Sequence, residues 1–331
     1  MRTSIRALLA LLAVLALAVG LAACGGDDEG GDTAAEGEAT PTETSAELIE
    51  ADPANEGKQV TIGSKNFAEQ YILGEIYAQS LEAGGFDVTK QLDLGSEQIA
   101  FRSLRRGGID AYPEYTGTAL TSFYRVAIDD VPRDQEEAFQ SLQQELEADD
   151  ITAMPMTPFE NTYRVASTQE TAEKYGNPAT MTELVTAIEE SGDEVSLSGF
   201  PECRQRTDCL LGLNEAYEWD PEFISSQGQY ADLDSGEADF TMAFSTDGPL
   251  STDKYVVYED DKGLFPPYNV TLLTSADGVE ALGESGQAIV EKVQEPLTEE
   301  VMRELNSRVA LDKQEPEAVA EDYLKEAGFV E

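Results

Sequence analysis

GSKNFAEQ at residues 63–70 and DAYPEYTGTAL at residues 110–120 are the two stretches of this sequence that say most about its fold. Each stretch follows or overlaps a segment that we predict to be a β-strand, residues 59–62 in the first case and residues 109–112 in the second. Lys65, Tyr115 and Thr118 therefore fall on loops just past predicted strands. That placement is expected of a site that holds a small zwitterion.

The two stretches lie in a regular alternation of predicted strands and helices. The helix predicted at residues 67–83 has apolar side chains that recur near a period of 3.6 residues, and Gly84 and Gly85 end it. Further strands are predicted at residues 87–92, 151–156, 163–166, 194–197 and 239–244, and further helices at residues 97–106, 134–149, 181–191, 209–217, 281–293, 299–308 and 316–327. This alternation predicts an α/β protein with mainly parallel sheets.

Prolines divide the folded part of the chain into two lobes. Pro155 and Pro158 bracket a predicted crossing into the second lobe, and FPPY at residues 265–268 is predicted to return the chain to the first. The expected fold is an α/β, two-lobed clamshell of the periplasmic-binding-protein kind (type II-like) with two hinge crossings. The first lobe would comprise residues 58–158 plus 269–331, and the second lobe residues 159–268.

The N-terminus has the pattern of an export signal. Two arginines precede an apolar run at residues 7–19, and LAAC at residues 21–24 closes the run with small side chains. This pattern predicts a secretory signal peptide at residues 1–23. LAAC also resembles a bacterial lipobox, in which the cysteine, here Cys24, becomes the lipidated first residue. Ordinary signal cleavage beside a free cysteine is the alternative.

Residues 24–57 are predicted to be a lipidated cysteine followed by a disordered acidic tether. Residues 25–57 contain 11 acidic residues and no lysine or arginine. Such a segment cannot bury enough apolar surface to offset the entropy lost on ordering, and its self-repulsion extends it. Two acyl chains on one cysteine give stable membrane attachment. We therefore expect the protein at the cell membrane, lipid-anchored on the extracytoplasmic side, in a periplasm or cell wall space.

The charge of the chain argues against several classes of function. The sequence has 66 acidic and 21 basic residues, no histidine, and a formal net charge of −45. Nucleic acid and anionic lipid surfaces are therefore poor partners. Without histidine, His-based triads, most zinc sites and the usual general base are missing, so we expect no enzyme, cofactor or metal. The excess of acid suits either a salty exterior or the attraction of cations.

Two cysteines remain once Cys24 is assigned to the anchor. Cys203 and Cys209 are an even pair in an oxidising compartment, which favours a disulfide. A Cys-x5-Cys metal half-site is the alternative, although the sequence has no second cysteine pair and no histidine to complete it.

Through nearly the whole folded part, the chain resembles the binding proteins that feed glycine betaine, choline and carnitine to ABC importers. The resemblance is carried by residues 63–70 and 110–120 and, in the same order along the chain, by residues 161–163, 206–208, 245–248 and 265–268. It implies an extracytoplasmic receptor that binds glycine betaine or a related quaternary amine between its lobes. The implied partner is an ABC permease in the cytoplasmic membrane, and the receptor is expected to be a monomer.

The resemblance also implies an aromatic box around the quaternary ammonium group. Carried over by motif, the box consists of Tyr115, Tyr163, Phe244 and Tyr268. A trimethylammonium group has no N–H donor, and ring faces offer it negative quadrupole density together with apolar contact. Phe244 departs from the pattern, since many relatives have tyrosine there; it keeps the ring face and loses a hydroxyl. Taken singly, each ring could instead be part of the core.

Three side chains are candidates for holding the carboxylate of such a ligand. Lys65 and Thr118 would bind it from the first lobe, and Arg206 would offer a bidentate fork from the second. Arg204 lies in the same loop and competes with Arg206. Asn161 could add an oxygen near the ammonium, or it could serve as a turn or helix-cap residue.

The sequence leaves other functions open. Among binding proteins, the ligand could be choline, carnitine or another zwitterion. A secreted hydrolase on a two-lobed scaffold belongs to a different class, and the chain lacks both a Gly-x-Ser-x-Gly elbow and a histidine base. A purely structural surface lipoprotein would bind no small solute.

Overall fold

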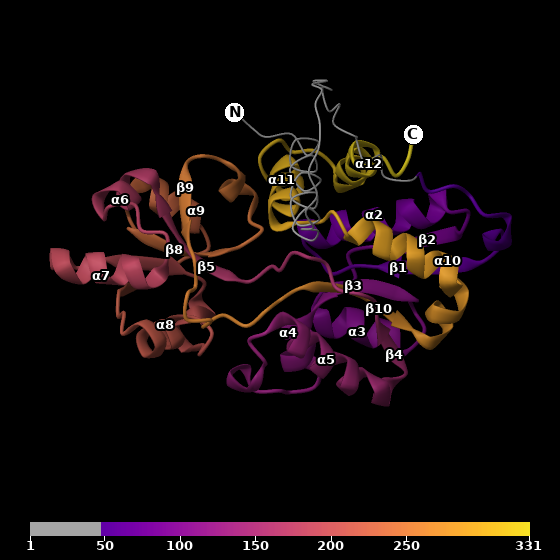
Figure 1. The fold of residues 1–331 in the computed structure, drawn as a ribbon, viewed down its shortest axis with the longest axis horizontal. Coiled ribbons are helices and arrows are strands. Elements are labelled where there is room, and N and C mark those ends of the chain that lie inside the picture. The colour runs from indigo at the N-terminus through magenta and orange to yellow at the C-terminus, as the bar shows by residue number, and fades with distance from the viewer. Residues whose placement is uncertain (1–47) are drawn as a thin grey trace, which may run out of the picture.

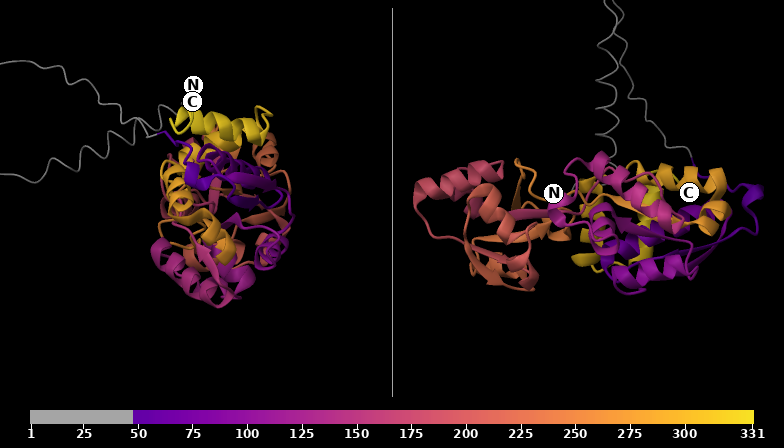
Figure 2. Two further views of the ribbon diagram at one scale, coloured as in Figure 1. Left: turned by 90° about the vertical axis from the view of Figure 1, so that its right-hand side faces the viewer. Right: turned by 90° about the horizontal axis from the view of Figure 1, so that it is seen from below.

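The computed structural model describes residues 48–331 of the chain. The predicted signal peptide, Cys24 and most of the predicted tether lie outside the described residues. Two lobes lie side by side and are joined by extended segments, with the C-terminal helices beside the first lobe (Figure 1, Figure 2). None of the helices between residues 48 and 331 combines the length and the hydropathy that a membrane span needs.

Each lobe is built on a five-stranded sheet. The first sheet has the order β2-β1-β3-β10-β4 and consists of β1 (Gln59–Gly63), β2 (Asp87–Gln91), β3 (Ala111–Tyr115), β4 (Ile151–Ala153) and β10 (Val270–Ser275). The second has the order β7-β6-β8-β5-β9 and consists of β5 (Tyr163–Thr168), β6 (Ser196–Gly199), β7 (Glu222–Ser225), β8 (Phe240–Phe244) and β9 (Tyr255–Tyr258). Because β10 rejoins the first sheet after the second is complete, the two-lobed α/β fold with two crossings is confirmed.

The predicted preference for parallel sheets is wrong. Of the eight strand pairs between residues 48 and 331, four are parallel and four are antiparallel. The antiparallel pairs all involve β5 or β10, the strands that follow the two crossings. These strands enter their sheets from the other lobe rather than through a helix of their own lobe, so the right-handed crossover that makes strands parallel does not apply to them.

Helices cover both faces of the first sheet. On one face lie α2 (Ala68–Ala83), α10 (Ala276–Gln294), α11 (Glu299–Ala310) and α12 (Pro316–Glu326), and on the other α3 (Glu97–Arg105) and α5 (Gln135–Leu146). Alternation along β3 serves both cores, since Ala111 and Tyr115 join the first and Tyr112 the second. The second lobe carries α6 (Gln169–Lys174), α7 (Met181–Ser191), α8 (Leu210–Tyr217) and α9 (Gln229–Ser235).

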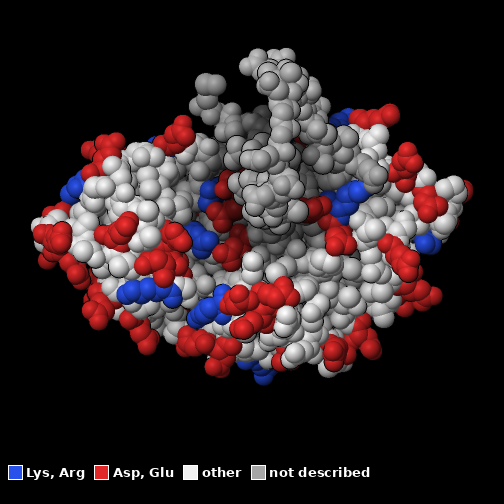
Figure 3. Space-filling model, viewed as in Figure 1, with Lys and Arg blue, Asp and Glu red and all other residues white. Residues whose placement is uncertain are grey.

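Two crossings form the hinge between the lobes. They run side by side, because the backbone N–H of Asn161 donates to the Tyr268 carbonyl at 3.0 Å and Thr162 Oγ1 donates to the Pro266 carbonyl at 2.9 Å. The division into lobes at residues 158 and 268 stays a prediction. Acidic side chains are spread over the visible face of both lobes, with fewer lysines and arginines among them (Figure 3).

A third connection joins the lobes beside the hinge. The short 3₁₀ helix η6 (Gly248–Ser251) of the second lobe packs against α11. A Cβ added at Gly248 would lie only 2.9 Å from the Ser307 Cα, so the two backbones are in direct contact. Asn306 Nδ2 also donates to the Thr246 carbonyl at 2.8 Å.

Candidate ligand-binding site

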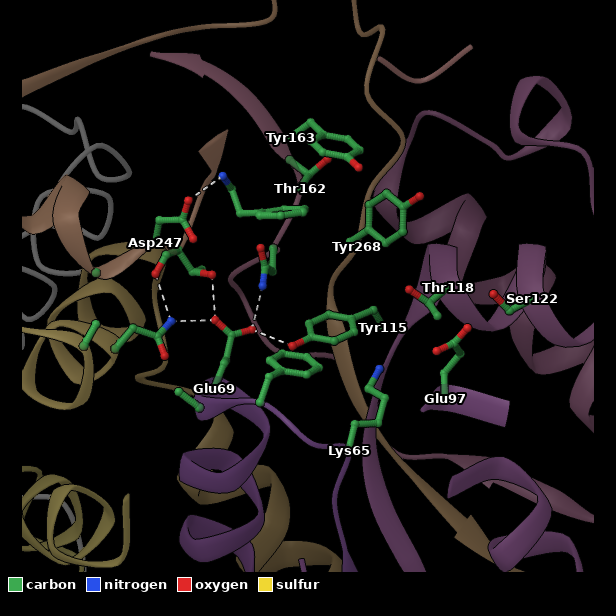
Figure 4. A pocket seen from close by; sticks show the side chains of 18 of the residues that line it. Lys65, Glu69, Glu97, Tyr115, Thr118, Ser122, Thr162, Tyr163, Asp247 and Tyr268 are labelled. Atoms are coloured by element: carbon green, nitrogen blue, oxygen red, sulfur yellow. Dashed lines mark hydrogen bonds between the residues drawn. The ribbon is translucent and has the colours of Figure 1, made fainter. Parts of the chain in front are cut away.

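A cavity of about 650 Å³ lies where the two lobes and the hinge meet. Its walls come from the loops after β1 and β3, from both crossings, from the end of β8 and from α11. All eight residues predicted for the ligand line this cavity: Lys65, Tyr115, Thr118, Asn161, Tyr163, Arg206, Phe244 and Tyr268. Figure 4 shows Tyr115, Tyr163 and Tyr268 around one common space.

The aromatic residues are brought together by strand register and by the hinge. Tyr163 and Phe244 are direct partners in the antiparallel β5–β8 ladder, and their rings stack with centroids 4.9 Å apart. Tyr115 ends β3, and Tyr268 lies on the return crossing. Burial, followed by the nearby charge of Glu69, raises the pKa of Tyr115 well above its usual range, so its hydroxyl remains a donor.

Gly117 makes room for Tyr268. A Cβ at this position would lie 2.8 Å from both the Tyr268 Cε1 and the Pro267 carbonyl oxygen. These distances are too short for any side chain, so the glycine lets the return crossing and its tyrosine approach the loop after β3. The tight approach of the two segments therefore depends on the glycine.

Lys65 is already paired with a carboxylate. Its ammonium group forms a buried ion pair with Glu114, and its Nζ lies 4.3 Å from the centre of the Tyr115 ring. Glu114 also accepts hydrogen bonds from the Tyr115 amide at 2.8 Å and from the Tyr112 hydroxyl at 3.0 Å. Such a pair is stable only because further hydrogen bonds satisfy it. Lys65 thus fixes the base of the aromatic box, and its predicted contact with a ligand stays a prediction.

Arg206 is also paired, but only along one edge. Its Nε and Nη2 donate to Asp208 at 2.7 and 2.5 Å, and these hydrogen bonds raise the pKa of Arg206. The edge that carries Nη1 is left for a ligand, and the side chain is 34% exposed. The guanidinium group lies 5.7 Å from the centre of the Tyr163 ring. This geometry suits a bidentate clamp on a carboxylate.

The disulfide predicted between Cys203 and Cys209 is formed and encloses the Arg206 loop. Both cysteines are buried. Arg204, the competing candidate, is directed elsewhere: it donates to the Phe223 carbonyl at 3.1 Å and lies over the Phe223 ring. Arg206, not Arg204, lines the cavity.

Sequence reasoning missed other residues of the cavity wall, among them Phe67, Glu69, Thr246 and Asn306. Phe67 is 40% exposed and stacks with Tyr115 at a centroid distance of 6.2 Å. It and Glu69 stand in the first quoted stretch, and Thr246 stands in the block at residues 245–248, so these positions carried a signal. Asn306 lies mid-helix in α11, where no local pattern marks it. The described residues contain no cluster that could ligate a metal.

Two hinged α/β lobes around a cavity define a substrate-binding protein of the kind that serves a membrane transporter. The chain belongs to one family of such proteins: residues 58–326 match the family described as the substrate binding domain of the ABC-type glycine betaine transport system. Its members are transport receptors that act with ABC permeases outside the cytoplasm, and are not known as enzymes.

Individual relatives support this assignment. The glycine-betaine-binding protein of Pseudomonas aeruginosa is 30% identical over 281 residues, which cover 82% of this chain and 88% of that protein. The ergothioneine transport permease/ergothioneine binding protein EgtU of Helicobacter pylori is 28% identical over 281 residues, 83% of this chain but 49% of that longer protein. A crystal structure described as a glycine betaine/carnitine/choline ABC transporter superposes with a TM-score of 0.73 at 26% identity, over 80% of this chain and 97% of that one.

Proposed function

We propose that this chain binds glycine betaine or a related quaternary amine in the cavity at its hinge and delivers it to an ABC permease. The observation that carries the proposal is the convergence of Tyr115, Tyr163, Phe244 and Tyr268 on one cavity. Each desolvated contact between a cation and a ring face contributes about 1–2 kcal/mol. Four such contacts would supply much of the roughly 8 kcal/mol that micromolar binding requires.

The carboxylate of the ligand is proposed to bind on the Arg206 side. The free edge of the Arg206 guanidinium offers two parallel donors, and Thr118 offers a hydroxyl. Lys65 has three ammonium hydrogens and one partner, so it can add a donor at the base of the cavity. Asn161 is proposed to contact the ammonium end through its amide oxygen, for which the described residues provide no hydrogen-bond partner.

Choline, which has no carboxylate, is the second candidate ligand, and the charge balance of the cavity favours a cation; carnitine, like glycine betaine, would need the Arg206 side. Both basic side chains in the wall are paired with a carboxylate. Three further acids, Glu69, Glu97 and Asp247, line the same cavity. The wall therefore carries more negative than positive charge, which lowers the cost of a ligand without a carboxylate.

Calorimetric titration of the purified protein tests this proposal. The panel is glycine betaine, choline, carnitine, ergothioneine and proline, and we expect micromolar or tighter binding of at least one quaternary amine and none of proline, which lacks the methylated ammonium. If no quaternary amine binds, or if one is chemically altered on incubation, the proposed function is wrong.

The membrane anchor is proposed from the sequence. We infer that Cys24 is diacylated and holds a monomeric receptor at the outer side of the cytoplasmic membrane, through the acidic tether. Mass spectrometry of the N-terminal peptide from membranes should show two or more acyl chains on Cys24. Cys24→Ala should release the protein into the soluble extracytoplasmic fraction without changing ligand affinity. If protein from membranes carried an unmodified Cys24, the proposed lipid anchor would be wrong, and the proposed ligand would be unaffected.

A further inference from the structure

A single carboxylate in the cavity wall collects hydrogen bonds from both lobes. Glu69 is 4% exposed, and its Oε1 accepts from the Tyr115 hydroxyl at 2.7 Å and from Asn161 Nδ2 at 3.0 Å. Its Oε2 accepts from Thr246 Oγ1 at 2.6 Å and from Asn306 Nδ2 at 2.7 Å. Figure 4 shows these bonds meeting at Glu69. All four donors are uncharged groups.

The four donors come from four separate parts of the chain. Tyr115 ends β3 of the first lobe, and Asn161 lies on the outward crossing. Thr246 follows β8 of the second lobe, and Asn306 lies on α11. Glu69 itself is in the first turn of α2. One side chain thus touches the first lobe, the hinge, the second lobe and α11.

These contacts lie beside the ligand site rather than in a remote core. Glu69, Tyr115, Asn161, Thr246 and Asn306 all line the cavity. Yet the two oxygens of Glu69 already accept four hydrogen bonds, which is about the acceptor capacity of a carboxylate. Glu69 therefore has no lone pair left for a ligand, and its effect on binding must pass through the groups it holds.

We propose that Glu69 is the positioning residue that couples the aromatic box to the hinge. It sets the Tyr115 ring and the Asn161 amide toward the ligand, and it holds the Thr246 loop of the second lobe against α11. This inference rests on the proposed function, because the box is the site where the ligand binds. It predicts that ligand affinity depends on a residue that makes no hydrogen bond to the ligand.

The chemistry of the site explains why a carboxylate is needed. An ionised carboxylate only accepts hydrogen bonds, so all four neighbours can donate at once. A glutamine in its place would keep the shape but would accept through one oxygen and donate through its nitrogen. The Asn161 and Asn306 amide oxygens are buried and have no partner among the described residues, so these amides can turn and accept from it. Glu69→Gln should therefore fold while pulling Asn161 away from its present orientation.

The first experiment compares Glu69→Gln with Glu75→Gln. Glu75 is on the same helix, is 6% exposed, pairs with Lys90 and does not line the cavity. We expect Glu69→Gln to weaken the binding of the best quaternary amine of the panel by at least fivefold in calorimetry. Glu75→Gln should leave it within twofold, even if its melting temperature falls more.

The second experiment is a double-mutant cycle with Tyr115→Phe, which keeps the ring face and removes the donor to Glu69. If Glu69 acts through Tyr115, the double variant should bind no more weakly than the weaker single variant. A role in general stability would instead make the two losses in affinity additive. Additive losses would overturn the coupling through Tyr115, and a Glu69→Gln protein that binds as tightly as the parent would overturn the whole proposal.

A third measurement needs no ligand. Hydrogen exchange of the amides at residues 245–248 should be faster in Glu69→Gln than in the parent, and unchanged in Glu75→Gln, since Glu69 accepts a hydrogen bond from Thr246 and Glu75 does not. If the parent protein binds no quaternary amine, the proposed function is wrong. The hydrogen-exchange rates then remain as the test of whether Glu69 holds the loop at residues 245–248. Unchanged exchange would then reject its link to the second lobe.

Discussion

The two lobes present walls of different construction to the ligand cavity. In the first lobe, Tyr115 is held by a hydrogen bond to Glu69 and lies over the Lys65–Glu114 ion pair, all of it buried. In the second, Tyr163 and Phe244 are held by ring stacking, and the charged group beside them is partly exposed. Buried polar networks are costly to disturb because every broken bond leaves an unpaired group. The first wall should therefore be rigid and sensitive, and the second more adaptable.

The largest difference in ligand affinity is expected between the variants Tyr115→Ala and Phe244→Ala. Each change removes one ring face, at a cost of about 1–2 kcal/mol in ligand binding. Tyr115→Ala also deprives Glu69 of a donor in a buried site, which adds about 1–3 kcal/mol if the network then relaxes away from its binding geometry. We expect at least tenfold weaker binding for Tyr115→Ala and a clearly smaller loss for Phe244→Ala, measured by calorimetry.

Circular dichroism and melting temperature serve as the control for both alanine variants. Equal losses of affinity in two folded proteins would show that the walls do not differ. An unchanged affinity in Tyr115→Ala would remove Tyr115 from the site.

Arg206 sharpens the comparison, because it is the charged group of the adaptable wall. Its charge-assisted hydrogen bonds to a ligand carboxylate should be worth about 1.5–3 kcal/mol. Arg206→Ala should therefore remove most of the advantage in affinity that glycine betaine has over choline and leave choline binding nearly unchanged. Asp208 would then be buried without its partner, so Arg206→Ala combined with Asp208→Asn separates ligand effects from loss of stability. A similar loss for both ligands would contradict a clamp specific to the carboxylate.

Gly117→Ala probes the contact between the rigid wall and the hinge. The new methyl group would force Tyr268 or the Pro267 carbonyl to move, and overpacking of this kind costs about 1–3 kcal/mol. Much of that cost should appear as weaker ligand binding, since Tyr268 is displaced from the box. Gly228→Ala is the matched control, because a Cβ there meets no atom closer than 3.9 Å. If the two variants bind alike, Tyr268 is not part of the box.

The longer of the described helices were predictable because their signals are local, whereas the short α6 and α9 were missed. The helix predicted at residues 181–191 is α7, and its start is fixed by a capping box between Thr180 and Glu183. The strands were harder to predict from the sequence. β7 is an edge strand whose side chains are all at least partly exposed, and β10 is a short apolar run that only the neighbouring β3 and β4 identify as a strand. Their strand character comes from tertiary pairing, which a local pattern does not contain.

The residues of the site also fall into a group that local patterns predict and a group that they do not. The residues of the aromatic box were found because ordered motifs carry them, whereas the partners of those residues depend on which loops meet in space. Glu114 stands in a quoted stretch, but its pairing with Lys65 follows from β1 and β3 being neighbours in the sheet. Asn306 reaches Glu69 across 237 positions of sequence. No pattern within one helix could predict that contact.

The smallest effect expected is a dependence of stability on pH that involves Asp247. This residue lines the second-lobe side of the cavity and accepts two hydrogen bonds, from the Phe244 amide at 2.9 Å and the Tyr230 hydroxyl at 2.8 Å. Glu69, in the first wall, accepts four. Burial raises the pKa of Asp247 above its usual range, with the charge of Glu69 adding to the shift.

The sign of this dependence follows from the proton balance. Because the folded state binds the Asp247 proton more tightly than the unfolded state, stability falls as the pH rises from about 4, the usual aspartate pKa, through the folded value. Asp234 should do the opposite, because its hydrogen bond with Lys254 lowers its pKa and stabilises the fold above that range. Urea unfolding at a series of pH values should therefore show a smaller decline in Asp247→Asn than in the parent, and a steeper one in Asp234→Asn. The same slope in parent and Asp247→Asn would mean that Asp247 titrates as an ordinary surface acid and that the second wall is less buried than its packing indicates.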